Sequence, residues 1–185
     1  MKNLVFVALG LLLFAFSCKN SKNETIIVTK SPPSSRYVCV PQITDAEWYK
    51  KDNVAPLLPG LDAVNYPITT KDTLVQRYFN QGMTLAYGFN HAEAARSFYY
   101  ASKLDPNCAM AFWGYAYVLG PNYNAGMEAD NYQRAFDAIQ KAKALAKNGT
   151  EKERQFNDAM ALRYVAEPPE DRSQLDIDYS KALKA

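Results

Sequence analysis

The residues with the strongest potential for chemistry are few. His91 is the single histidine of the 185-residue chain, whereas transition-metal sites normally need three or four ligands. His91 is therefore either a structural residue at the start of a helix or one wall of a polar ligand pocket. The other members of such a pocket would be Asn90, Asn122 and Asn124. Both interpretations stay open, and the sequence predicts no metal site and no cofactor.

The two cysteines in the body of the chain are the next candidates. Cys39 and Cys108 lie far apart in sequence, and they form either a disulfide in an oxidising compartment or two buried thiols. Cys108, at a predicted helix start, could also be a reactive thiol with a lowered pKa. No second histidine is present as its base, and no Ser/His/Asp, paired-cysteine or glycine-rich phosphate signature occurs. We therefore predict that the chain is not an enzyme.

The first 17 residues have the pattern of an export signal. Lys2 precedes an apolar run over residues 4–16 that is too short to span a bilayer comfortably, and polar sequence follows directly. The letters AFSC resemble a bacterial lipobox, so we expect Cys18 to carry a lipid anchor, with a cleaved, unanchored exported protein as the alternative. Lysines and asparagines rather than acidic residues follow Cys18, which favours the periplasmic face of an outer membrane over the cell surface.

Composition predicts a globular body that does not bind nucleic acid. Hydrophobic residues make up 48% of the chain, and the 21 basic and 19 acidic residues are interspersed, so no basic stripe for a phosphate backbone is present. Residues 18–36 are polar and are expected to form a flexible tether. Residues 37–70 are proline-rich and irregular, with one short helix predicted in TDAEWYKK, where Thr44 and Glu47 have capping-box spacing. We expect this irregular segment to lie against the rest as a lid or N-terminal cap.

Helical periodicity begins after Thr70 and continues through residues 71–185. One helix face is predicted from apolar and small residues three or four positions apart, namely Leu74, Tyr78, Gly82, Leu85 and Phe89. Asn90 and Glu93 have N-cap spacing, so a second helix should begin at His91. Its inner face would hold Ala94, Phe98 and Ala101, and Pro106 would follow its end.

Four further helices are predicted, over about residues 107–119, 129–147, 150–165 and from 171 or 173 onward. The third helix should place Met110, Trp113 and Ala116 inward, together with Tyr117 or Leu119. The last helix carries no stop signal up to Ala185. We therefore expect these residues to be the front part of a longer array.

One helix pair matches a 34-residue period strongly, the next pair moderately and the third weakly. A unit that starts at Val75 and closes at Pro106 resembles a tetratricopeptide repeat, with Gly82, Ala94 and Ala101 as the small residues where its helices cross. The segments PLLPGL, YPITT, YFNQG, YGFNHAEAARSF, LDPNCAMAFWGYA and GPNYN resemble a family of exported tetratricopeptide-repeat lipoproteins of Bacteroidota with no established activity. The resemblance implies an all-α fold of helical hairpins stacked as a short right-handed solenoid, behind an irregular N-terminal segment.

Two departures from that family bear on cofactors. Tyr66 and Ala111 stand where family members often carry histidine and a second cysteine, which argues against metal or haem at these positions.

Two functions are predicted. The first is a lipid-anchored scaffold that binds a protein or peptide partner in a concave groove, where Asn80, Thr84 and Tyr87 would face the partner. The alternative is a glycan- or small-ligand-binding lipoprotein resembling the starch-uptake lipoproteins. Trp113, Tyr115 and Tyr117 belong either to the core between repeats or to such a groove.

Overall fold

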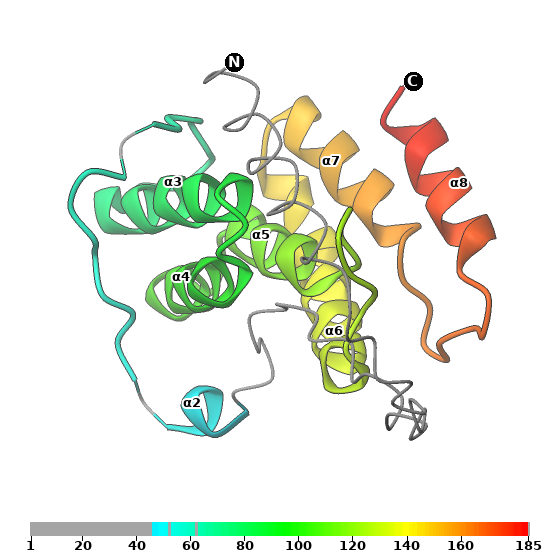
Figure 1. Cartoon of the computed structure of the whole chain (residues 1–185). Helices are drawn as coiled ribbons and strands as arrows, with labels where there is room; N and C mark the ends of the chain where they lie inside the picture. The colour runs from blue at the N-terminus through cyan, green and yellow to red at the C-terminus, as the bar shows by residue number, and fades with distance from the viewer. Residues whose placement is uncertain (1–45, 52, 62, 185) are drawn as a thin grey trace, which may run out of the picture. The chain divides into compact units, whose positions relative to one another are not determined.

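The computed structural model describes residues 46–51, 53–61 and 63–184, which all belong to one compact unit. Within them the fold is all-α, as predicted. The helices are α2 (Ala46–Lys50), α3 (Thr73–Tyr87), α4 (His91–Leu104), α5 (Ala109–Leu119), α6 (Ala129–Leu145), the 3-10 helix η2 (Ala146–Asn148), α7 (Glu151–Ala161) and α8 (Ser173–Ala182) (Figure 1). The predicted leader and tether, Cys18, Cys39 and Thr44 lie outside the described residues.

The caps explain where the helices begin. Asn90 accepts a hydrogen bond from the Glu93 N–H at 3.4 Å, so the predicted start at His91 is confirmed. Thr150 and Glu153 form a full capping box at the start of α7. The start of α3 depends on Asp72, whose carboxylate accepts from the Leu74 N–H at 2.7 Å.

Three predicted helix ends are wrong. α3 ends at Tyr87, and Phe89 lies beyond it with a φ of 59° and a side chain that is 56% exposed, so it is not part of the buried face. α7 ends at Ala161 rather than near Val165. α8 ends at Ala182, although no stop signal is visible in the sequence. Helix ends depend on tertiary contacts as well as local sequence, which is why they are harder to predict than capped starts.

From α3 onward, each α-helix packs on its neighbours in the chain. α3 contacts α4 and α5, α5 contacts α6 and α7, and α7 contacts α8 (Figure 1). Phe98 of α4 is fully buried between two glycines: a Cβ on Gly82 of α3 would lie 2.7 Å from its ring, and a Cβ on Gly114 of α5 would also overlap it. Three helices can therefore approach one aromatic ring because two of them carry no side chain there.

An extended segment of residues 55–61 and 63–70, which we name the strap, follows the outer face of α3. Three N–H groups of the strap, two residues apart, donate to three side-chain oxygens of α3, four residues apart. The pairs are Val64 to Thr84 at 3.3 Å, Tyr66 to Asn80 at 3.2 Å and Ile68 to Gln76 at 2.9 Å. Two extended residues span about 6.6 Å and four helical residues about 6 Å, so the two spacings match.

Other polar side chains complete the attachment of the strap. Gln81 of α3 accepts from the Leu58 N–H at 2.8 Å and donates to the Pro56 carbonyl at 2.9 Å. Farther along, the buried Glu153 carboxylate of α7 accepts from the N–H of Thr69 at 2.6 Å and from its hydroxyl at 2.5 Å. The strap is thus attached to two helices that are remote in sequence.

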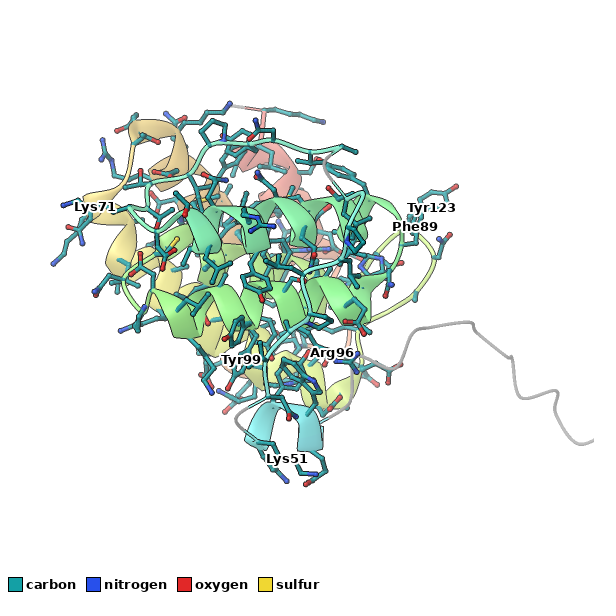
Figure 2. The ribbon with its side chains drawn as sticks, turned by 90° about the vertical axis from the view of Figure 1, so that its left-hand side faces the viewer. Lys51, Lys71, Phe89, Arg96, Tyr99 and Tyr123 are labelled. Atoms are coloured by element: carbon teal, nitrogen blue, oxygen red, sulfur yellow. The ribbon has the colours of Figure 1, made fainter. Side chains whose placement is uncertain are left out.

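The short helix α2 is held by aromatic contacts. Trp48 and Tyr49 make edge contacts with the Tyr99 ring of α4, at centroid distances of 6.2 and 5.1 Å. The Arg96 guanidinium lies 5.6 Å from the Trp48 ring centroid. Figure 2 shows Arg96 and Tyr99 on the side of α4 that faces α2.

Candidate functional site

The candidate site is a pair of adjoining cavities with three tyrosines in common, Tyr87, Tyr117 and Tyr179. The inner cavity, of about 270 Å³, is lined by α3, α5, α7 and the C-terminal end of the chain; its other walls are Tyr66, Phe79, Met83, Met110, Trp113, Phe156 and Leu183. The outer cavity, of about 430 Å³, also includes the loop after α5; its other walls are Ala86, Phe89, His91, Gly120, Pro121, Asn122, Tyr123, Arg163 and Asp176. Both volumes are in or close to the range of small-molecule sites.

The inner cavity is apolar and its rings are fixed in place. Trp113 and Tyr117, one turn apart on α5, stack with a centroid distance of 5.4 Å and an interplanar angle of 6°. The indole N–H of Trp113 donates to the Phe156 carbonyl at 3.0 Å, which ties α5 to α7. These aromatic side chains therefore serve both as core and as cavity wall.

The outer cavity has exposed rings at its mouth. Tyr87 is 65% exposed, Phe89 56% and Tyr123 97%. Figure 2 shows Phe89 and Tyr123 at the same edge of the molecule. Phe89 reaches this position because its left-handed backbone turns the chain out of α3 before α4 begins. Exposing several large aromatic rings to water around one hollow is unfavourable, and such exposed apolar patches are typical of binding sites.

His91 forms part of the wall of the outer cavity as an isolated imidazole. Both ring nitrogens are inaccessible and have no hydrogen-bond partner, and the Phe89 ring lies 6.1 Å away in an edge contact. Burial lowers the pKa of His91, so the neutral form is favoured. His91 therefore contributes no charge at neutral pH.

The cation of the outer cavity is Arg163, which follows the end of α7. Its side chain is held by a hydrogen bond from Nη2 to the Pro121 carbonyl and by the Tyr179 ring, whose centroid is 5.1 Å from Cζ. The residue is 9% exposed and its Nε has no acceptor. Tyr164, the next residue, donates to the Ala116 carbonyl, and burial raises its pKa to about 12.

The predicted site residues separate into two groups. Tyr87, His91 and Asn122 line the outer cavity, whereas Asn80 and Thr84 are hydrogen-bonded to the strap.

The two remaining predicted residues have local roles. Asn90 caps α4, and the N–H of Asn124 donates to the Asn122 side chain within the exposed loop. Arg163 and Tyr179 belong to the cavity but were missed, because the sequence between residues 91 and 179 contains no pattern that links them to His91.

Cys108 does not have the properties of a reactive thiol. It is free, it is 1% exposed, and burial raises its pKa to about 11. The hypothesis of a lowered thiol pKa is wrong because desolvation outweighs the backbone N–H groups at the start of α5.

No group of three or more His, Cys, Asp or Glu side chains in the described ranges is arranged to hold a metal ion. No helix in those ranges has the length and apolar character needed to cross a bilayer.

Comparison with known proteins gives no match. No family model, no curated protein and no solved structure is similar to this chain.

Proposed function

We propose that this chain is a lipid-anchored tetratricopeptide-repeat protein that binds a saccharide in its outer cavity. The observation that carries the proposal is the outer cavity itself: three exposed aromatic rings at the mouth of a hollow of about 430 Å³ with polar groups in its walls. The carbon-bound hydrogens of a sugar ring form an apolar face that stacks on an aromatic ring. Its hydroxyl groups need donors and acceptors such as Asn122 and Arg163.

The repeat assignment is supported by packing at the crossing of the helices. Gly82, Ala94 and Ala101, the small residues of the predicted unit, are all buried, and Gly82 contacts the Phe98 ring. The lipid anchor at Cys18, the outer membrane and its periplasmic face remain proposals from the sequence pattern alone.

The strap occupies the outer face of α3, and this favours the second predicted function, ligand binding, over the first. Asn80 and Thr84 were expected to face a protein partner, but they bind the backbone of the strap. Tyr87, the third residue of that set, is exposed at the mouth of the outer cavity. The geometry therefore supports a compact ligand there better than a long segment along this row of α3.

A glycan array probed with the full-length chain in detergent tests the proposal. Binding to at least one class of saccharide is expected, and Tyr87→Ala should reduce it at least tenfold because a stacking ring is lost. Val54→Ala, which removes a 63% exposed apolar side chain outside the cavity, serves as the control and should bind as the parent does. An array without signal, or a signal that Tyr87→Ala leaves unchanged, would overturn the proposal.

A protein or peptide partner is the second candidate, and the inner cavity favours it. α3, α5 and α7 all contribute to this apolar hollow, where a side chain such as leucine or phenylalanine would fit between Met83, Trp113 and Phe156. Phage display of random peptides on the full-length chain would distinguish the two candidates. Enriched peptides that no longer bind the Met83→Asp variant would support a peptide partner in the inner cavity. The absence of any enriched peptide would rule this second candidate out.

A further inference from the structure

Arg163 is a buried cation without a carboxylate partner. It is 9% exposed, and no carboxylate in the described part of the chain forms an ion pair with it. Of its nitrogens, Nη2 donates to the Pro121 carbonyl, while Nε has no acceptor. Burying a charge without an opposite charge is strongly unfavourable. The fold nevertheless keeps this arginine in the wall of the outer cavity.

The position of the guanidinium is fixed by its surroundings. A Cβ on Gly120 would lie 2.9 Å from Nη1, so the glycine leaves room for the guanidinium against the backbone of the loop. The Cζ atom of Arg163 also lies over the Tyr179 ring, 5.1 Å from its centroid. A guanidinium held between a loop and a ring is preorganised and loses little side-chain entropy when it binds a ligand.

Asp176 is the acidic residue in the same cavity, and its field is weak at Arg163. Its carboxylate forms an ion pair with Arg172 at 3.9 Å, and its side chain is 53% exposed. Solvent and salt screen an exposed carboxylate much more than a buried cation. Asp176 should therefore reduce the attraction for an anion without cancelling it.

The other titratable wall residues do not supply an anion. His91 is neutral, and burial raises the pKa values of Tyr117 and Tyr179, so both phenols stay protonated at neutral pH. Apart from Asp176, the described wall of the cavity therefore offers Arg163 no anionic side chain.

We infer that the outer cavity selects an acidic sugar, whose carboxylate pairs with Arg163 while its ring stacks on the aromatic mouth. This inference rests on the proposed saccharide function and names its substrate class, a uronic acid unit. A carboxylate suits the planar guanidinium because two parallel N–H···O bonds can form. In glucuronic acid the carboxylate is carried on the same ring that presents the apolar face, so one residue of a glycan can satisfy both parts of the site.

Glucuronic acid and glucose form a matched pair of probes, since they differ at carbon 6 in a carboxylate against a hydroxymethyl group. NMR titration of the full-length chain in detergent should give at least tenfold tighter binding for glucuronic acid. Its methyl ester should bind like glucose, and acetate alone should bind weakly because it lacks the ring.

Two variants localise the effect. Arg163→Gln should abolish the preference for glucuronic acid, and thermal unfolding establishes that this variant is folded. Asp176→Asn removes the carboxylate of the cavity wall and should tighten glucuronic acid binding two- to threefold. The second variant keeps the inference testable if the first does not fold.

The outcomes separate the inference from the proposed function. Equal binding of glucuronic acid and glucose, or a preference that survives Arg163→Gln, would overturn the acidic-sugar inference and leave saccharide binding in place. Binding of neither sugar at millimolar concentration, together with an empty glycan array, would overturn both.

Discussion

The strap and the outer cavity differ in whether their polar groups have hydrogen-bond partners. Along the strap, the side chains of α3 pair with backbone groups, and Gln76, Gln81 and Thr84 each accept from one strap N–H and donate to one strap carbonyl. In the outer cavity, both nitrogens of His91 and the Nε of Arg163 have no partner. Native proteins leave few buried polar groups unpaired, so the contrast is informative.

The difference separates groups that stabilise the fold from groups that are free for a ligand. Removing a side chain of the strap attachment should lower the free energy of unfolding, because its partners lose their hydrogen bonds. Removing an unpaired group of the cavity should leave stability unchanged or raise it, because a desolvation cost disappears. The following substitutions test this comparison, beginning with the largest expected effect.

Glu153→Gln should lower the free energy of unfolding by about 3 kcal/mol. The carboxylate accepts from the N–H and hydroxyl groups of both Thr69 and Thr150, and hydrogen bonds to charged groups are the strong ones. Urea unfolding at pH 7 measures the effect. Glu151→Gln, on the exposed first turn of α7, is the control and should cost less than about 0.5 kcal/mol. A loss under about 1 kcal/mol for Glu153→Gln would contradict the role of the strap attachment.

The same carboxylate predicts an acid-sensitive stability. Burial by itself raises the pKa of Glu153. The hydrogen bonds from Thr69 and Thr150 lower the pKa by more than burial raises it, so the net pKa is below the usual value. A depressed carboxyl pKa contributes stability above the unfolded-state value of about 4.3 and loses it as the pH falls through the folded-state value. Glu153→Gln should remove this part of the acid dependence in urea titrations between pH 6 and pH 3.

Gln81→Leu should cost about 2 kcal/mol. Its amide joins Leu58 and Pro56 of the strap to the Ser97 hydroxyl of α4, and leucine would remove all three of these hydrogen bonds. Gln140→Leu on the exposed face of α6 is a matched control, expected within about 0.5 kcal/mol of the parent. If both substitutions changed the free energy of unfolding equally, the claim that the strap attachment stabilises the fold more than an exposed side chain does would be wrong.

His91→Leu should stabilise the chain by up to about 1 kcal/mol, because an imidazole with two unpaired nitrogens is replaced by an apolar side chain. The gain should grow as the pH falls from 7 to 5. Burial lowers the pKa of His91, so the parent holds its stability above the unfolded-state pKa of about 6.5 and loses it as the pH falls through the lower folded-state value. Urea unfolding at both pH values is the measurement, and a destabilised variant would show that His91 has a structural partner.

Tyr123→Ala should change the free energy of unfolding by less than about 0.5 kcal/mol, since its side chain is 97% exposed. It should nonetheless weaken saccharide binding, because its ring belongs to the mouth of the outer cavity. A thermal melt and a sugar titration on the same sample measure both quantities. A large fall in the melting temperature would show that Tyr123 stabilises the fold, as the strap attachment does, and is not free for a ligand.

The helical body was predictable because its signals are local. The Asn90 cap and the Thr150 capping box are each contained within four residues, and the helix starts predicted at His91 and at about residue 150 are confirmed. The small side chains at Gly82 and Ala94 indicated a close helix crossing, and the structure adds Gly114 as a second glycine against Phe98. Gly114 was missed because the 34-residue pattern does not require glycine there.

The strap attachment and the isolated arginine were not predictable, for different reasons. Asn80 and Thr84 read as exposed polar residues, because the irregular segment that binds them has no period that gives its register. Arg163 resembles any other charged residue in sequence. Its importance lies in the absence of an ion-pair partner within the described residues, and such an absence becomes visible when the chain is folded.

The strap on α3 has a consequence for how this sequence can change over generations. The side chains of α3 contact the backbone N–H groups of Val64, Tyr66 and Ile68, so the contacts place little demand on which side chains the strap carries. They place a strict demand on its length, because inserting or deleting one residue between these groups would turn alternate N–H groups away from the helix. Residues 63, 65 and 67 of this stretch are exposed and should therefore accept substitutions, whereas Tyr66 and Ile68 also pack against the core. Insertions and deletions should be resisted along the whole stretch.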